Sequence, residues 1–379
     1  MKIPRILGHK RLKWRHGLLI ALLLLIALIK MAPRWGVIYT FVVYPRIGAL
    51  LSHLSGCIPF ALGDLFIAAS IAWVVCYPLS GFLRFSHTRT SWKKILAREV
   101  EFLLWIYAWF YLAWGLNYSQ PDIFSRMKMT PAKVSKNTLR KFANTYVDSL
   151  NLLSEEVSIK GEESKYIKKL ENFDNVKVKS KVETLKGYND LSKCPIFMGI
   201  NTPFNQNPHV KTMTFSWLSS MAGVTGSMGP FFCEFTLNKD VLPHEYPATY
   251  AHEFAHFLGI ANEGEANFYS YLVCTNSNDR YVKFSGYYHI LFHVIANVYD
   301  ILGKEEGNTF VKRINPKVIA LARNDRKYWL DKRCKAIDKV QDFIFELYLK
   351  GNNVKEGRKS YSGVILLIMS WEEKLHIII

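Results

Sequence analysis

The chain has 379 residues, half of them apolar and 14% aromatic, which is more than one domain's worth of core. Its net charge of +18 raises the question of nucleic-acid binding. However, residues 1–118 carry 14 Lys and Arg against 3 acidic residues, whereas residues 119–379 carry 35 against 28. Since the excess lies mostly beside apolar runs and no nucleic-acid-binding motif accompanies it, we expect no nucleic-acid partner.

Three apolar runs in the first 118 residues predict membrane-spanning helices. They are Leu18–Ala32, Pro59–Leu83 and Phe102–Leu116, interrupted only by Lys30 and Asp64. With interfacial residues counted, the predicted spans cover about 17–33, 59–80 and 101–118. A cleaved signal peptide is the alternative for the first run, but it lacks a small-x-small cleavage site and two further runs follow.

The distribution of basic residues predicts the orientation of these spans. Six Lys and Arg precede the first span and five lie around the loop between the second and third, but only Arg34 and Arg46 lie between the first and second. By the positive-inside rule the N-terminus is cytoplasmic. We therefore expect a multi-pass protein of the bacterial inner membrane, with a membrane domain at 1–118 and a periplasmic or extracellular domain at 119–379.

The second domain is predicted to be α+β and mainly helical. Apolar residues recur every three or four positions between Leu139 and Leu153, within a charged stretch that reaches residue 190 and favours helices packed on one face. Between Pro195 and Val241 short apolar runs alternate with glycines, which predicts a small antiparallel sheet. The six cysteines form no CxxC pair, which disfavours a Cys-ligated metal.

The pattern His252-Glu253-Phe254-Ala255-His256 is the strongest functional signal. On a helix, positions i and i+4 share a face, so the two imidazoles converge as half of a zinc site. The glutamate between them can reach a metal-bound water and act as its general base. Pro247 lies just before the pattern and Gly259 just after it, as expected for the two ends of a helix.

A catalytic zinc needs a third protein ligand. Asn262 stands where a metzincin has its third histidine, which disfavours that class. The run Asn262–Asn267 instead resembles the second motif of thermolysin-like gluzincins, Asn-Glu-x-x-Ser/Ala-Asp, whose glutamate binds zinc. This resemblance implies that Glu263 is the ligand, although the spacer from His256 is short, and Glu265 is the alternative. It also puts Asn267 where the family has an aspartate that orients the first histidine.

A zinc hydrolase also needs a donor for the oxyanion that forms on the attacked carbonyl. The candidates are Tyr287, Tyr288, His289 and His293, of which we take Tyr287. In zincins the edge strand above the HExxH helix binds extended substrate through its backbone, and the predicted sheet directly precedes the motif here. A purely structural sheet is the alternative.

Several stretches along the chain resemble the bacterial membrane proteins of the domain-of-unknown-function family numbered 3810. They are Pro59-Phe60 with Gly63-Asp64, Trp114–Tyr118, His252–Phe268, Ser285–Tyr287, and Leu349–Asn352 with Gly357, Ser360 and Tyr361. The resemblance covers nearly the whole chain and implies a membrane-anchored, zincin-like domain. It implies little about substrate.

Together these features predict a membrane-anchored zinc metallohydrolase, most simply a peptidase acting on a peptide or protein. His252, His256 and Glu263 would bind Zn²⁺, and Glu253 would take a proton from the bound water. The alternative is a catalytically silent, zinc-stabilised envelope domain that binds a partner protein.

Overall fold

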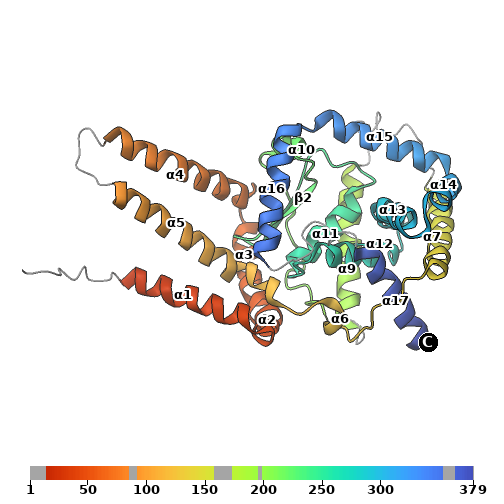
Figure 1. Ribbon diagram of the computed structural model, residues 1–379, viewed down its shortest axis with the longest axis horizontal. Coiled ribbons are helices and arrows are strands. Elements are labelled where there is room, and N and C mark those ends of the chain that lie inside the picture. The colour runs from red at the N-terminus through yellow and green to blue at the C-terminus, as the bar shows by residue number, and fades with distance from the viewer. Residues whose placement is uncertain (1–13, 85–91, 158–172, 195–198, 353–362, 379) are drawn as a thin grey trace, which may run out of the picture.

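The computed structural model describes residues 14–84, 92–157, 173–194, 199–352 and 363–378. Three long helices, α1 (Trp14–Met31), α4 (Leu62–Arg84) and α5 (Trp92–Ala113), extend side by side from a larger helical body (Figure 1). Between α1 and α4 lie α2 (Pro33–Ile38), a π-helical turn η1 (Tyr39–Val43) and α3 (Tyr44–Gly56). A 3₁₀ turn, η2 (Gly115–Ser119), follows α5.

Among the described residues, three helical stretches are long and apolar enough to cross a membrane: Trp14–Met31, Pro33–Gly56 and Leu62–Gly81. They suggest a membrane anchor and are compatible with association with a lipid bilayer. The first and third coincide with the predicted spans at 17–33 and 59–80. The predicted span at 101–118 is not among the three. It falls on α5, which begins earlier, carries Arg98, Glu99 and Glu101, and ends at Ala113, whereas Pro33–Gly56 was not predicted as a span. Residues 1–13 and 85–91, which hold six of the basic residues that predict orientation, lie outside the described residues.

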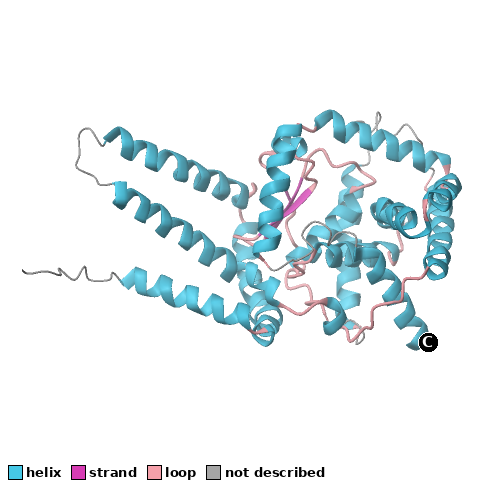
Figure 2. Cartoon of the chain, viewed as in Figure 1, coloured by secondary structure: helices cyan, strands magenta, loops and turns pink. Residues whose placement is uncertain are grey.

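The body is mainly helical, as predicted (Figure 2). Its helices are α6 (Ile123–Arg126), α7 (Lys136–Glu156), α9 (Phe173–Lys193), α10 (Ser216–Met221), α11 (Tyr246–Phe257), α12 (Glu263–Thr275), α13 (Arg280–Leu302), α14 (Lys304–Arg313), α15 (Pro316–Lys332), α16 (Lys335–Gly351) and α17 (Val364–Ile378).

Helix α7 confirms the spacing seen in the sequence. Ser135 caps its N-terminus in a reciprocal capping box with Thr138. Leu139, Tyr146 and Leu150 are buried on one face, which packs against α13. The helix therefore forms because a cap and an apolar stripe coincide.

The sheet has three short strands, β1 (Lys211–Thr212), β2 (Gly226–Gly229) and β3 (Glu234–Leu237), in the order β1-β3-β2. The prediction of an antiparallel sheet was wrong in part: β2 pairs antiparallel with β3, but β1 pairs parallel with β3. A parallel pair needs a long connection, and the one from β1 to β3 contains α10 and β2. The strand expected near residue 196 falls mostly on 195–198, outside the described residues.

One hydrophobic core joins the N-terminal helices to the body. It contains Leu19, Tyr44 and Trp114 together with Phe254 and Phe268. The HExxH helix therefore packs against the same apolar cluster as the N-terminal helices.

Candidate metal centre

Helix α11 carries the HExxH pattern and has the predicted ends. It begins at Tyr246 with Pro247 in its first turn, and Gly259 follows its last residue with a left-handed φ of +94°. Tyr250 and Phe254 are almost completely buried and pack edge-on against Phe235 of β3. Because this face is fixed by the core, the two histidines lie on the opposite side.

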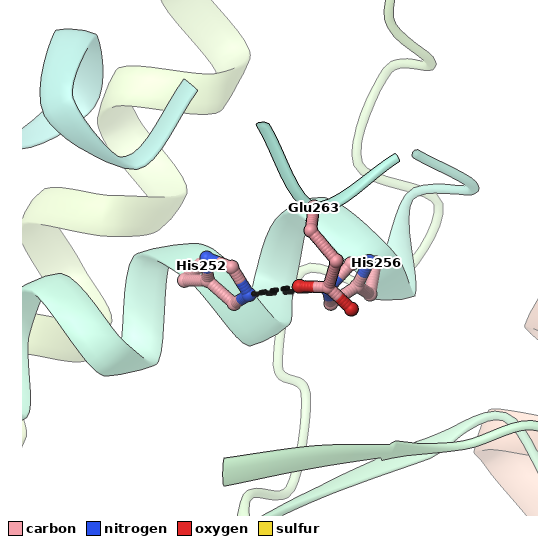
Figure 3. Close-up of side chains that lie close together, drawn as sticks. All are labelled: His252, His256 and Glu263. Carbon is pink, nitrogen blue, oxygen red and sulfur yellow. Dashed lines mark hydrogen bonds and ion pairs between the residues drawn. The ribbon is translucent and has the colours of Figure 1, made fainter. Parts of the chain in front are cut away.

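His252, His256 and Glu263 come together (Figure 3). The two Nε2 atoms are 3.1 Å apart, and Oε2 of Glu263 lies 3.2 Å from Nε2 of His252 and 3.4 Å from Nε2 of His256. With zinc bonds of about 2.0–2.1 Å, adjacent ligand atoms of a tetrahedron lie about 3.3–3.4 Å apart. Two imidazoles and one carboxylate are also a donor set typical of catalytic zinc, so these residues fit the ion.

The short spacer before Glu263 is accommodated by a sharp turn. The chain reverses at Gly259, and Asn262 then caps α12 by accepting a hydrogen bond from the amide of Glu265. Glu263 is thus the first residue of α12, directly opposite the last turn of α11. The left-handed backbone conformation of Gly259 and the side-chain cap of Asn262 together bring the end of α11 and the start of α12 close enough to contribute ligands to one metal centre.

Glu265 lies elsewhere. Its carboxylate accepts hydrogen bonds from the guanidinium of Arg126 and the amide of Ile123, and both charged side chains are buried. Glu265 therefore holds α6 and α12 together, and Arg126 is a partner that sequence reasoning missed.

The imidazoles and the carboxylate of the metal centre shift the pKa values of Glu263 and His256. Burial by itself lowers the pKa of His256, but the carboxylates of Glu263 and Glu253 and the carbonyl of Ile260 together outweigh it and raise that pKa to about 9. Burial likewise favours protonated Glu263, yet the two imidazoles hold the pKa of Glu263 well below its usual value. Without a metal the pocket thus favours an ionised carboxylate beside a protonated His256, and a bound metal would displace that proton.

The hydrogen bonds that orient the imidazoles differ from the expectation that Asn267 lies where it can orient His252. Nδ1 of His256 lies 2.6 Å from the carbonyl oxygen of Ile260, which fixes the ring. Within the described part of the chain, Nδ1 of His252 has no hydrogen-bond partner. Oδ1 of Asn267 accepts a hydrogen bond from Nε2 of His289 at 2.9 Å, so among the described residues Asn267 pairs with His289 and not with the first histidine of the motif.

Glu253 lies beside this group and is only 6% exposed. Burial raises its pKa, and the two imidazoles lower it to a smaller extent. Its Oε2 has no hydrogen-bond partner among the described residues. A Cβ atom at Gly226 of β2 would lie 2.4 Å from Oε1 of Glu253, so only glycine lets the strand pass this close.

The last turn of α11 is held by residues distant in sequence. Its carbonyl groups accept hydrogen bonds in succession: that of His256 from Trp114 Nε1, that of Phe257 from the Tyr44 hydroxyl, that of Leu258 from Asn201, and that of Gly259 from Gln120. The carbonyl of His256 also accepts from the amide of Gly259, and the other three belong to the end of the helix, where carbonyl groups have no intrahelical donor. Two of the donors, Tyr44 and Trp114, come from the N-terminal helices and the residue directly after them.

A cavity of about 1190 Å³ opens at the metal centre. His252, Glu253, His256 and Glu263 all line it, together with the edge strand β2 and parts of α4, α5, α13 and α16. The arrangement can bind a metal, hold a base beside it and admit a ligand of substantial size.

The four candidate oxyanion donors of α13 have different surroundings. The ring of Tyr287 packs against Tyr146 and Tyr271, and Tyr287 is not among the described residues that line the cavity. His289 and His293 do line it, and burial lowers the pKa of both, so each is neutral near pH 7. Tyr288 instead donates a hydrogen bond to Asp325.

A second group of titratable residues lies at the start of α11. His244 Nε2 is 2.7 Å from Asp325 Oδ2, which also accepts from Tyr288, while Trp329 donates to Glu245. Burial raises the pKa of Glu245 to about 7. This network connects the beginning of α11 to α13 and α15, and no sequence pattern indicated it.

No curated protein and no solved structure matches the chain significantly. A family model does match, over residues 39–369, and this range includes η1, α3, α4 and α5 as well as the whole metal centre. The chain therefore belongs to the family described as Protein of unknown function (DUF3810).

Proposed function

We propose that the chain is a membrane-anchored, zinc-dependent hydrolase with a zincin-like centre, and that it cleaves peptide bonds. The observation that supports this most directly is the convergence of His252, His256 and Glu263 at tetrahedral spacing beside Glu253, in a cavity that is open to a ligand. Zinc held by the three ligands supplies a Lewis acid and an acidified water.

The residues of the chain then have distinct tasks. Glu253 takes the proton of the attacking water, and its raised pKa and free carboxylate oxygen suit a general base. His293, neutral and lining the cavity, can donate a hydrogen bond to the developing oxyanion, whereas the one N–H of neutral His289 is donated to Asn267. Backbone groups on the free edge of β2 can pair with an extended peptide.

The test is Glu253→Gln in the full-length protein purified in detergent. The amide keeps the shape of the side chain but cannot accept the proton, so we expect an unchanged zinc content and a loss of activity on the order of 10²–10⁴-fold. Zinc is measured by mass spectrometry and activity with a quenched-fluorescent peptide library.

His256→Ala is the comparison variant and should lose the zinc. Loss of zinc from Glu253→Gln would instead make Glu253 a ligand or a structural residue. A wild-type protein that holds zinc and cleaves no peptide in the library would favour the silent, partner-binding domain.

We further propose that the body lies on the outer side of the bacterial inner membrane, because of the positive-inside rule. Two substitutions in a cysteine-free background test this topology. Lys141→Cys places a thiol at an exposed position of α7 in the body, and Lys94→Cys places one at an exposed position near the N-terminal end of α5. A membrane-impermeant maleimide should label Lys141→Cys in intact cells and Lys94→Cys only after permeabilisation. The reverse pattern would invert the topology.

A further inference from the structure

The cavity at the metal centre extends well beyond the polar residues. Its other end is lined by apolar and aromatic side chains of the N-terminal helices: Ile67 of α4 and Leu103, Ile106, Tyr107 and Phe110 of α5. One continuous space therefore connects the candidate catalytic residues to α4, one of the helices that suggest a membrane anchor, and to α5, which packs beside it. A soluble peptide would not need this second, apolar part.

The exposure of the α5 wall changes systematically along the helix. Leu103 and Tyr107 are 49% and 42% exposed, whereas Tyr111 and Trp114, nearer the metal centre, are each 4% exposed. These positions recur at three- and four-residue intervals and so form one face. The α5 wall of the cavity is thus exposed far from the metal centre and covered next to it, as expected if the occupant enters sideways from the bilayer.

The length of this wall corresponds to one leaflet. From Leu103 to Trp114 the helix rises about 16 Å, at 1.5 Å per residue. Half of a hydrocarbon core of about 30 Å is about 15 Å, which is the depth that one acyl chain covers.

The length of the wall also distinguishes an acyl chain from a membrane-spanning helix. A helix that crosses the hydrocarbon core is about 30 Å long, so about half of it would lie beyond a wall of about 16 Å. A single acyl chain covers one leaflet and therefore matches the length of the wall.

We propose that the substrate is a lipid-anchored peptide, with its acyl chain along α5 and a peptide bond close to the anchor beside His252 and His256. The inference rests on the proposed peptidase function. Water adds across the C–N bond, which breaks to give a carboxylate on one product and an amine on the other. The acylated product stays in the membrane, and the peptide product leaves.

The experiment uses the full-length protein in phospholipid nanodiscs and one quenched-fluorescent peptide carried in two ways. One form bears an N-terminal palmitoyl chain, and the other is fused to a Leu/Ala membrane-spanning helix. Both concentrate at the bilayer, so a difference in kcat/KM reports the fit to the cavity. We expect the palmitoyl form to be cleaved more efficiently, on the order of tenfold.

Two variants of α4 test the location of the chain. Ile67→Trp should fill the apolar end and reduce the preference for the palmitoyl form on the order of fivefold. Leu65→Trp is the matched control, since Leu65 is similarly exposed, does not line the cavity and lies on the opposite face of the helix. It should retain the preference.

Photo-crosslinking separates this inference from the proposed function. A palmitoyl chain that carries a diazirine should crosslink to Ile106 in the Glu253→Gln protein, and Ile67→Trp should reduce that crosslink. An active enzyme without preference for the palmitoyl form, or one that prefers the helical form, overturns the inference alone. A protein that gives the crosslink but cleaves neither form supports the lipid site and overturns the peptidase.

Discussion

At the scale of single residues, two glutamates separated by one glycine have opposite environments. Glu263 lies against the two histidines of the HExxH pattern, while Glu265 is bound by Arg126. Positions i and i+2 of a helix point about 200° apart, so one α-helical turn cannot bring both carboxylates to the same site. The structure thus assigns them different neighbours, although the sequence motif is compatible with either.

This difference can be tested with paired alanine variants of the full-length protein. Glu263→Ala removes a proposed ligand and should weaken zinc binding at least about 100-fold, since even partners of ligands contribute about 10–100-fold. Glu265→Ala should keep the zinc but leave Arg126 buried without its carboxylate, which costs about 3–5 kcal/mol of stability.

Zinc affinity by chelator competition and the melting temperature separate these two effects. Zinc loss in Glu265→Ala with a retained melting temperature would reverse the assignment.

At the scale of elements, the position of α11 is determined by its neighbours. Its aromatic face packs on β3, its first turn connects to α13 and α15 through the group around Asp325, and its last carbonyl groups are bound by four distant donors. A helix of 12 residues is marginal in isolation. The metal centre therefore depends on the capping of this helix as much as on its histidines.

Tyr44→Phe should remove one of these caps. The Tyr44 side chain is completely buried, and its hydroxyl donates to the carbonyl of Phe257 at 2.7 Å. Loss of the donor leaves a buried acceptor unpaired, so we expect a decrease in the free energy of unfolding of about 1–3 kcal/mol.

Tyr77→Phe is a suitable control, because the Tyr77 hydroxyl meets Arg98 at an exposed site. It should change stability by less than about 0.5 kcal/mol. Equal melting temperatures for the two variants in detergent would show that the cap contributes little.

At the scale of the whole molecule, the N-terminal helices and the body do not divide cleanly at residue 118. The core cluster contains buried residues from both, and the cavity has walls from both. The family model likewise begins at residue 39, well before the body. The N-terminal helices therefore complete the site in addition to suggesting an anchor.

A fragment of residues 119–379 tests this dependence. It lacks Tyr44 and Trp114, which cap α11, and it exposes the apolar surface that they cover. We expect it to aggregate or to bind zinc at least about tenfold more weakly than the full-length protein, because at least two buried carbonyl groups lose their donors. Expression, chelator competition and thermal unfolding are the measurements. A soluble fragment with the zinc affinity of the full chain would show that the body is independent.

Much of the local structure could be predicted from the sequence. The apolar periodicity of α7, the Pro247 and Gly259 ends of α11, and the antiparallel pairing of β2 with β3 all follow from neighbouring residues. The spacing of His252 and His256 likewise fixes their common face, because helical geometry needs no other information.

Only the tertiary structure decided which distant groups meet. It pairs Arg126 with Glu265 and His289 with Asn267. It also pairs β1 parallel with β3 and brings the apolar face of α5 to the same cavity as the HExxH helix. These contacts join residues between about 20 and about 150 positions apart, whose pairing depends on how whole elements pack and not on the periodicity of any one segment. For this chain, the sequence alone determined the motif and its helix, and the packing of the N-terminal helices determined the shape of the cavity around it.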